Sequence, residues 1–193
     1  MAKAEKDKPL GAGKSSFDLI DSQAVFGELG LQRGSTFLDV ACGRGDYTLA
    51  ASKAVRKSGL IYAVDLWEEG IATLQEKAAA QGIENIEALV CDVGKKIPLE
   101  TGRVDVCLMS TVLHDLVQTG DVDGTLKEVG RVLKSQGSLA VIEFKKIDGP
   151  PGPPISVRLT PDETESLVLP HGFRKKRTLD VGLYNYMMTF GLT

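Results

Sequence analysis

Short apolar runs alternate along the chain with longer stretches whose apolar residues recur at helical spacing. A short apolar run between turn residues predicts a buried strand. Such runs lie at Thr36–Val40, Leu60–Val64, Ile86–Cys91, Val104–Met109 and Ser138–Phe144. Helices are predicted at Phe17–Leu29 and Asp46–Lys57, and along the stripes Trp67–Ala78 and Val122–Leu133. Alternation of this kind indicates a doubly wound α/β fold, in which helices cover both faces of a mostly parallel sheet.

Capping residues mark the ends of two predicted helices. Ser15 or Ser16 is a candidate N-cap for the first helix, and Gly30 is its stop signal. The run Thr160–Glu163 has the form of a capping box with proline at the first helical position. Both helices therefore have predicted start points.

The C-terminal part of the chain predicts a loop and a hairpin. Glycine and proline at 149–154 form too short a run for collagen and predict a stiff loop. Phe173–Leu179 and Tyr184–Phe190 predict two last strands joined as a hairpin. The charged N-terminal residues predict a flexible arm at 1–14. The rest of the chain shows no internal repeat, so we expect a single domain at 15–193.

Composition narrows the class of protein. The 193 residues are 42% apolar and 25% charged, which is typical of one globular domain. A net charge of −3 gives no general attraction to nucleic acid or to an anionic membrane. No apolar run is long enough to span a membrane, and the N-terminus lacks a secretory signal. Three cysteines without CxxC spacing favour a reducing compartment, so we expect a cytoplasmic protein with no metal site.

A glycine-rich loop follows the first predicted strand. Gly43 and Gly45 let the backbone turn sharply and approach a ligand, and the helix that begins near Asp46 directs free N–H groups at the same place. A dinucleotide loop needs a third glycine where this chain has Thr48, so that pattern fails. Asp39 would repel a pyrophosphate but suits an ammonium or sulfonium group, which favours S-adenosylmethionine. The alternative role of Asp39 is to cap the loop.

Acidic residues also follow the second and third strands. Asp65 stands about twenty positions after the loop and is suited to ribose hydroxyls. Leu66 and Trp67 can flank an adenine, although Trp67 also fits the apolar stripe of its helix. Asp92 can accept a hydrogen bond from the adenine amino group. Three carboxylates after three successive strands are stronger evidence together than any one alone.

Four segments resemble the motifs of the class I S-adenosylmethionine-dependent methyltransferases. They are FLDVACGRGDY at Phe37–Tyr47, YAVDLW at Tyr62–Trp67, ALVCDV at Ala88–Val93 and VDVCLMSTVLHDL at Val104–Leu116. Gly13–Asp21 and the C-terminal tail look like those of short prokaryotic members of the ubiquinone/menaquinone-biosynthesis branch. The chain departs from the commonest first motif at Ala41, where many members carry glycine. Because alanine is small, we expect cofactor binding to survive.

The resemblance implies a fold, an activity and a set of site residues. The fold is Rossmann-like, with seven strands in the order 3-2-1-4-5-7-6 and the last antiparallel, and the activity is transfer of a methyl group to a small-molecule acceptor. Asp39 and the Ala41–Gly45 backbone would hold the methionine end, the Ser110 carbonyl would lie near its amino group, and Phe17 would form a lid. The cofactor-binding residues implied are Phe17, Asp39, Ala41, Cys42, Gly43, Gly45, Tyr47, Asp65, Leu66, Trp67, Asp92, Val93 and Ser110. A homodimer is one option for the assembly.

His114 is the candidate catalytic residue. It follows the fourth strand, where the acceptor would lie, and imidazole has a suitable pKa for a base. Asp115 could orient it, and the equally weighted alternative is that His114 only opens the next helix. Tyr184 and Tyr186 are candidates for the acceptor side, because alternation along a strand puts both on one face.

Other functions fit the sequence less well. A P-loop at Gly11–Ser15 lacks the first glycine, since Lys8 stands there. Metalloid binding by Cys42, Cys91 and Cys107 is disfavoured because two of them lie in apolar strands. A nicotinamide oxidoreductase is disfavoured by Thr48 and Asp39. A non-catalytic partner subunit that keeps the cofactor site is the main alternative to an enzyme.

Overall fold

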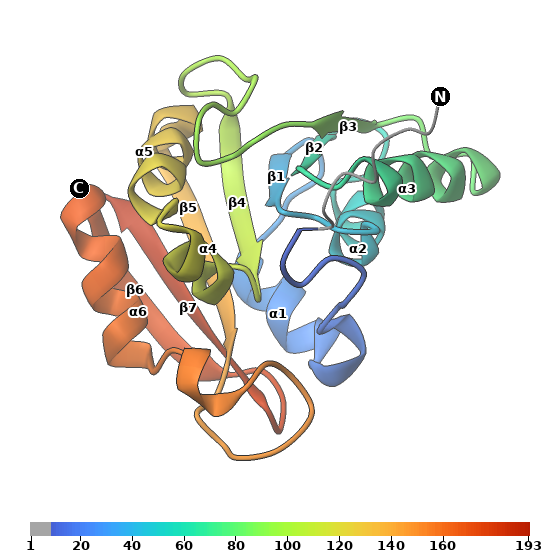
Figure 1. The fold of residues 1–193 in the computed structure, drawn as a ribbon. Coiled ribbons are helices and arrows are strands. Elements are labelled where there is room, and N and C mark those ends of the chain that lie inside the picture. The colour runs from blue at the N-terminus through green and yellow to red at the C-terminus, as the bar shows by residue number, and fades with distance from the viewer. Residues whose placement is uncertain (1–8) are drawn as a thin grey trace, which may run out of the picture.

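A seven-stranded sheet runs through the computed structural model, which describes residues 9–193 (Figure 1). The strand order is β3-β2-β1-β4-β5-β7-β6, and only β7 runs antiparallel to its neighbours. The strands are β1 Thr36–Val40, β2 Leu60–Asp65, β3 Ile86–Val90, β4 Val104–Ser110, β5 Leu133–Phe144, β6 Phe173–Asp180 and β7 Asn185–Leu192. The predicted fold class and strand order are confirmed.

Helices cover both faces of the sheet (Figure 1). They are α1 Ser22–Leu29, α2 Asp46–Val55, α3 Glu68–Ala80, α4 Leu113–Thr119, α5 Val122–Val132 and α6 Pro161–Val168, with short 3-10 segments at Phe17–Leu19, Ile155–Val157 and Leu169–His171. The α1 and α2 helices pack on one face and α4, α5 and α6 on the other, while α3 contacts β2 and β3. Alternate residues of each central strand therefore enter different cores.

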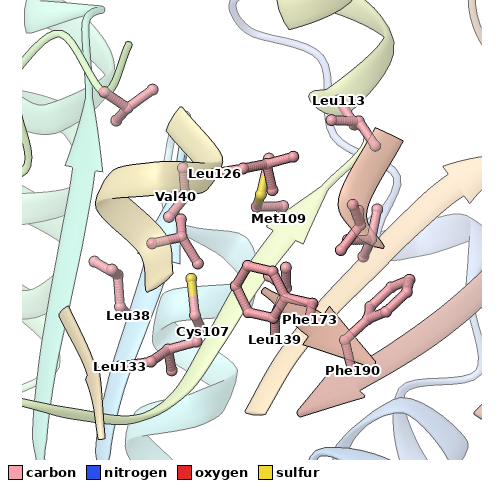
Figure 2. Close-up of a cluster of buried hydrophobic side chains, with 14 of the residues drawn as sticks. Leu38, Val40, Cys107, Met109, Leu113, Leu126, Leu133, Leu139, Phe173 and Phe190 are labelled. Atoms are coloured by element: carbon pink, nitrogen blue, oxygen red, sulfur yellow. The ribbon is translucent and has the colours of Figure 1, made fainter. Parts of the chain in front are cut away.

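The larger core lies between the sheet and α4, α5 and α6. Figure 2 shows Cys107 and Met109 of β4 in this core, with Leu126 of α5 and Phe173 of β6. The intervening β4 residues, Val106 and Leu108, enter the opposite core with α1 and α2. Burial on both faces explains why the central strands read as continuous apolar runs.

The first helix begins later than the sequence predicts. Asp21, and not Ser15 or Ser16, is the N-cap of α1, and its Oδ1 accepts hydrogen bonds from the N–H groups of Gln23 and Ala24. Ser16 is instead buried, with its Oγ 3.0 Å from the hydroxyl of Tyr47. This tertiary contact removes Ser16 from the capping role that its local sequence favours.

Other boundaries agree with the sequence or shift by a few residues. Gly30 ends α1 at φ 61°, and the capping box of Thr160 and Glu163 is formed. Leu133 begins β5 and does not end α5, while β7 starts only at Asn185. Within residues 9–193, no helix is long and apolar enough to cross a membrane.

Candidate functional site

A cavity opens at the carboxyl ends of β1 to β4. It has about 880 Å³ of empty space with its open mouth included. The residues that line it at the ends of these strands are Ala41, Gly43, Asp65, Leu66, Asp92, Val93, Gly94, Ser110, Thr111 and Val112. Four strands thus converge on one ligand-sized space, at the edge where doubly wound sheets bind their ligands.

The loop between β1 and α2 turns through the left-handed backbone region. Ala41, Gly43 and Gly45 have φ angles of 57°, 55° and 78°. A Cβ at Gly45 would lie 2.3 Å from Leu74 Cδ1, so glycine lets the loop pack against α3. A Cβ at Gly43 would meet nothing within 4 Å. Since Gly43 lines the cavity, we infer that this open space is where a ligand approaches the backbone.

Ala41→Gly tests the backbone strain in this loop. We expect the free energy of unfolding to rise by about 0.5–1 kcal/mol, because relief of the left-handed strain outweighs the extra entropy of unfolded glycine. Urea denaturation measures the change. Ala72→Gly, in the exposed face of α3, is the matched control and should instead lower stability by about 1 kcal/mol. Equal destabilisation by both variants would show that Ala41 is unstrained.

Asp65 joins the end of β2 to the glycine loop. Its Oδ2 accepts a hydrogen bond from the Gly43 N–H at 2.7 Å, and its Oδ1 accepts one from the Trp67 N–H at 2.7 Å. Burial raises the pKa of Asp65, and the backbone donors partly oppose that rise. Each carboxylate oxygen can accept a second hydrogen bond. Asp65 therefore fixes the loop and still has acceptor capacity toward the cavity that it lines.

Asp39 lies behind the loop and not in the cavity wall. It is 2% exposed, and its Oδ2 accepts a hydrogen bond from the Thr48 hydroxyl at 2.5 Å. Burial raises the pKa of Asp39 to about 7, although the Thr48 bond lowers it. These contacts agree with a loop-fixing role, and an interaction of Asp39 with the methionine end of a ligand stays a prediction.

The described part of the N-terminal arm lies against the same cavity. Residues 9–14 form turns in which Ala12 N donates to Pro9 O and Lys14 N donates to Gly11 O, and all six residues line the cavity. A Cβ at Gly11 would lie 2.7 Å from Asp115 Oδ2, so glycine permits this close approach. The sequence prediction of an arm at 1–14 separate from the domain did not anticipate this wall, and residues 1–8 lie outside the described part.

A second cavity adjoins the first. The two share Leu10, Gly11, Lys14, Thr111 and Asp115 in their walls. The second is closed by His114, by Phe144 and by the loop 151–154. Thr111, at the junction, has φ 51°, an unusual conformation for a β-branched residue and one that is concentrated at functional sites.

A buried histidine–glutamate pair reaches the second cavity. His114 Nδ1 lies 2.7 Å from Glu143 Oε2, and the His114 backbone N–H donates to Glu143 Oε1. Glu143 is fully buried, and His114 Nε2 lies 3.5 Å from Asp115 Oδ1. Burial lowers the pKa of His114, but the hydrogen bond and charge of Glu143 outweigh it, so the pKa is raised. The pair fixes the imidazole with Nε2 directed away from Glu143.

Glu143 is the main site residue that the sequence analysis missed. Asp115 was predicted to orient His114, whereas in the structure His114 Nδ1 is hydrogen-bonded to Glu143. The sequence does contain a feature that could have identified Glu143, because it is the one carboxylate within the otherwise apolar run at 139–144. A carboxylate fully buried in a central strand needs a polar partner. Other cavity residues outside the prediction are Gly94, Thr111, Val112, Leu116, Thr119 and Asp121.

The structure brings together about half of the predicted cofactor residues. Those that line the first cavity are Ala41, Gly43, Asp65, Leu66, Asp92, Val93 and Ser110, and those that do not are Phe17, Asp39, Cys42, Gly45, Tyr47 and Trp67. Phe17 contacts the Tyr47 ring edge-on, with centroids 5.0 Å apart, and lines neither cavity. Trp67 packs beside Gly70 of α3, where a Cβ would lie 2.5 Å from its ring.

The prediction that Tyr186 lines the acceptor side is wrong. Tyr186 is 2% exposed, donates its hydroxyl proton to Leu159 O and lies 2.7 Å from Thr164 Oγ1. Tyr184 precedes β7 and lines neither cavity, because the last strand starts one residue after it. Both tyrosines thus lie outside the two cavities.

The cysteines are free thiols held away from thiolate chemistry. Burial raises the pKa of Cys42 and Cys107 well above the usual value, and that of Cys91 to about 11. Among residues 9–193, no group of three or more His, Cys, Asp or Glu side chains is arranged to hold a metal ion. Metalloid binding therefore has no support from the described residues.

The strand order, the glycine loop after β1 and the acidic residue at the end of β2 define a Rossmann-like methyltransferase. The chain belongs to the ubiE/COQ5 methyltransferase family, whose model matches residues 21–152.

Relatives and solved structures agree with this assignment. Demethylmenaquinone methyltransferase of Staphylococcus aureus is 34% identical over 119 residues, which are 62% of this chain and 47% of the relative. The chain thus spans about half the length of that relative. The crystal structure of a SAM-dependent methyltransferase from Aquifex aeolicus is 33% identical with a TM-score of 0.85, and 93% of each chain is covered. The PH0226 protein of Pyrococcus horikoshii, 20% identical with a TM-score of 0.72 and coverages of 89% and 87%, shares the fold.

Proposed function

We propose that the protein transfers a methyl group from S-adenosylmethionine to a small-molecule acceptor. One observation carries this proposal: the cavity built by the glycine loop and Asp65 adjoins a second cavity that is lined by His114, whose ring is held from behind by the buried Glu143. A cofactor and an acceptor would then occupy neighbouring spaces. Bound S-adenosylmethionine supplies an activated methyl group on a positively charged sulfur, so the protein's main task is to orient the acceptor.

The residues of the first cavity fit this cofactor. Gly43 leaves open the space that a Cβ would fill, which suits close approach of the methionine portion to the backbone. Asp65 has acceptor capacity for the two ribose hydroxyls. Leu66 is 55% exposed in the cavity wall and offers an apolar surface for adenine. Asp92 lines the same cavity and offers an acceptor for the adenine amino group.

The second cavity fits an acceptor that must lose a proton. His114 Nε2 is the ring nitrogen not used by Glu143, and a neutral imidazole can accept the proton there. Glu143 holds the ring, and Asp115 lies on the Nε2 side. The name of the Staphylococcus aureus relative makes demethylmenaquinone the first acceptor to test. We also propose that the protein is cytoplasmic, because its three cysteines are free thiols, as expected in a reducing compartment. That the protein forms a homodimer stays a prediction.

Methyl transfer is tested directly with radiolabelled S-adenosylmethionine. We expect the wild-type protein to move the label to demethylmenaquinone that a reductant has converted to its hydroquinone, which has a hydroxyl proton for a base to remove, or to another small acceptor in a screen. In a parallel thermal-shift assay, S-adenosylhomocysteine should raise the melting temperature and NAD should not, because only a bound ligand stabilises the fold. Binding without turnover on any acceptor would favour a non-catalytic partner subunit.

Asp65→Ala tests the ribose role. We expect cofactor affinity to fall by about 1.5–3 kcal/mol, the scale of a lost charge-assisted hydrogen bond. Calorimetry with S-adenosylhomocysteine measures it. Asp105→Ala is the matched control, because Asp105 also accepts a backbone N–H, from Thr36, but lines neither cavity. Unchanged affinity in folded Asp65→Ala protein would remove Asp65 from the cofactor site.

The pH dependence of turnover tests the histidine–glutamate pair. A base must be unprotonated, and Glu143 and Asp115 raise the pKa of His114 while burial and Arg158 lower it. Turnover should therefore rise with pH through a value above the ordinary histidine pKa of about 6.5. In Glu143→Gln this acidic limb should move to lower pH, since the carboxylate charge is gone. An acidic limb that stays in place would assign it to another group.

A further inference from the structure

Arg158 is the most heavily bonded side chain beside the second cavity. It is 2% exposed, and all five N–H groups of its guanidinium donate to backbone carbonyls. The acceptors are the carbonyls of Lys145, Ile147, Gly149, Pro151 and Pro153. Every second carbonyl of the segment 145–153 thus points at one guanidinium, and the loop wraps around it.

The loop's sequence explains why it needs such a partner. Four of the residues at 150–154 are proline, which has no N–H to donate. The loop therefore has few N–H groups for its own carbonyls, and a donor from outside the loop satisfies the others. A planar fork with five donors suits this task, whereas a lysine ammonium has only three donors on a flexible stem.

The same loop forms a wall of the second cavity. Phe144, Pro151, Gly152, Pro153 and Pro154 line it. The Arg158 guanidinium carbon lies 5.5 Å from the centre of the Phe144 ring. A Cβ at Gly152 would lie 2.7 Å from that ring, so the loop backbone rests on Phe144. Arg158, Phe144 and the loop therefore form one packed unit opposite His114.

We propose that Arg158 is a positioning residue for the methyl acceptor: it holds the loop 145–153 in the one shape that closes the acceptor cavity over His114. The inference rests on the proposed function for the acceptor, but its structural part stands on the hydrogen bonds alone. Arg158 lines neither cavity, so it would act on an acceptor through the loop that it holds. Its charge also lowers the pKa of His114, and a lysine variant keeps that charge.

Arg158→Lys tests the proposal with two readouts. In hydrogen-exchange mass spectrometry, amides within 145–153 should exchange faster, while those of β1 and β4 stay protected. In the methyl-transfer assay, KM for the acceptor should rise by about tenfold or more, since displacement of a positioning wall by about 1 Å has effects of this size. S-adenosylhomocysteine affinity should stay at the wild-type value, because the loop lies outside the first cavity.

Arg131→Lys is the matched control. Arg131 also donates to two loop carbonyls, Ile97 O and Leu99 O, but that loop lines neither cavity. Loss of this clamp should leave the acceptor KM unchanged. Gly152→Ala is a second route to the same effect. The added Cβ would meet the Phe144 ring, and the φ of 103° strains alanine, so the loop should move while the Arg158 side chain is unchanged. It should reproduce the rise in KM.

Failure of the Arg158 proposal can be distinguished from failure of the proposed methyl transfer. Unchanged exchange in 145–153, or a wild-type acceptor KM in both Arg158→Lys and Gly152→Ala, overturns the proposal. A fall in kcat alone, equal in Arg158→Lys and Arg131→Lys, also overturns it, because a general loss of stability would then explain the result. If the wild-type protein methylates no acceptor, the proposed function fails, and the exchange data still decide whether Arg158 holds the loop.

Discussion

His114→Ala should lower methyl-transfer turnover by about 100-fold or more, the usual scale for a lost general base. Affinity for S-adenosylhomocysteine should stay close to wild type, because His114 lines the second cavity and not the first. Turnover and affinity must be measured on the same folded sample, so that binding and chemistry are separated.

His171→Ala provides the control for this prediction. His171 is the other histidine of the chain; it pairs with the exposed Asp123 and lies outside both cavities. Its loss should leave turnover unchanged. A His114→Ala protein that keeps its rate per folded molecule would make His114 a structural residue. Collapse of cofactor affinity would instead move His114 to the cofactor site.

Gly43→Val should abolish measurable cofactor binding while the protein still folds. The added side chain would occupy the open space beside the loop, and valine also resists the left-handed φ of 55°. Calorimetry with S-adenosylhomocysteine is expected to show no heat of binding at concentrations that saturate the wild-type protein.

Gly82→Val separates strain from steric exclusion. Gly82 has φ 63°, and a Cβ there would also meet nothing within 4 Å, but it lies after α3 and outside the first cavity. The two substitutions should cost similar stability, and only Gly43→Val should lose the cofactor. Normal binding by Gly43→Val would show that the loop does not cradle the ligand.

The central strands were predictable because burial on both faces leaves a simple pattern. The β1 strand has the predicted bounds, and β2, β3 and β4 differ by one residue at an end. Helix starts were less predictable. Ser16 has the right local chemistry for an N-cap, but its hydroxyl is taken by Tyr47, 31 residues away. Local propensity cannot anticipate a tertiary contact of that kind.

The lining of the first cavity was predictable where motif residues follow strands directly. Asp65, Asp92 and Ser110 reach the cavity because parallel strands end at one edge of the sheet. Tyr47 and Trp67 belong to the same motifs but line neither cavity. Their spacing alone does not distinguish a ligand contact from packing.

The lining of the second cavity depends on contacts between distant segments, which the sequence pattern does not show. Glu143 comes from β5 and His114 from α4, and Leu10, Gly11 and Lys14 of the arm line both cavities. The prolines at 150–154 predicted a stiff loop, but only the structure shows that Arg158 holds it. These features follow from tertiary packing and not from any local pattern.

A crystal structure with bound S-adenosylhomocysteine tests the central claim most directly. The ribose hydroxyls should bond to the Asp65 carboxylate and the methionine portion should follow the Ala41–Gly45 backbone. The sulfur should then face the junction of the two cavities at Thr111 and Asp115, open toward His114. A ligand outside the first cavity, or one whose sulfur is sealed from the second, would contradict the account.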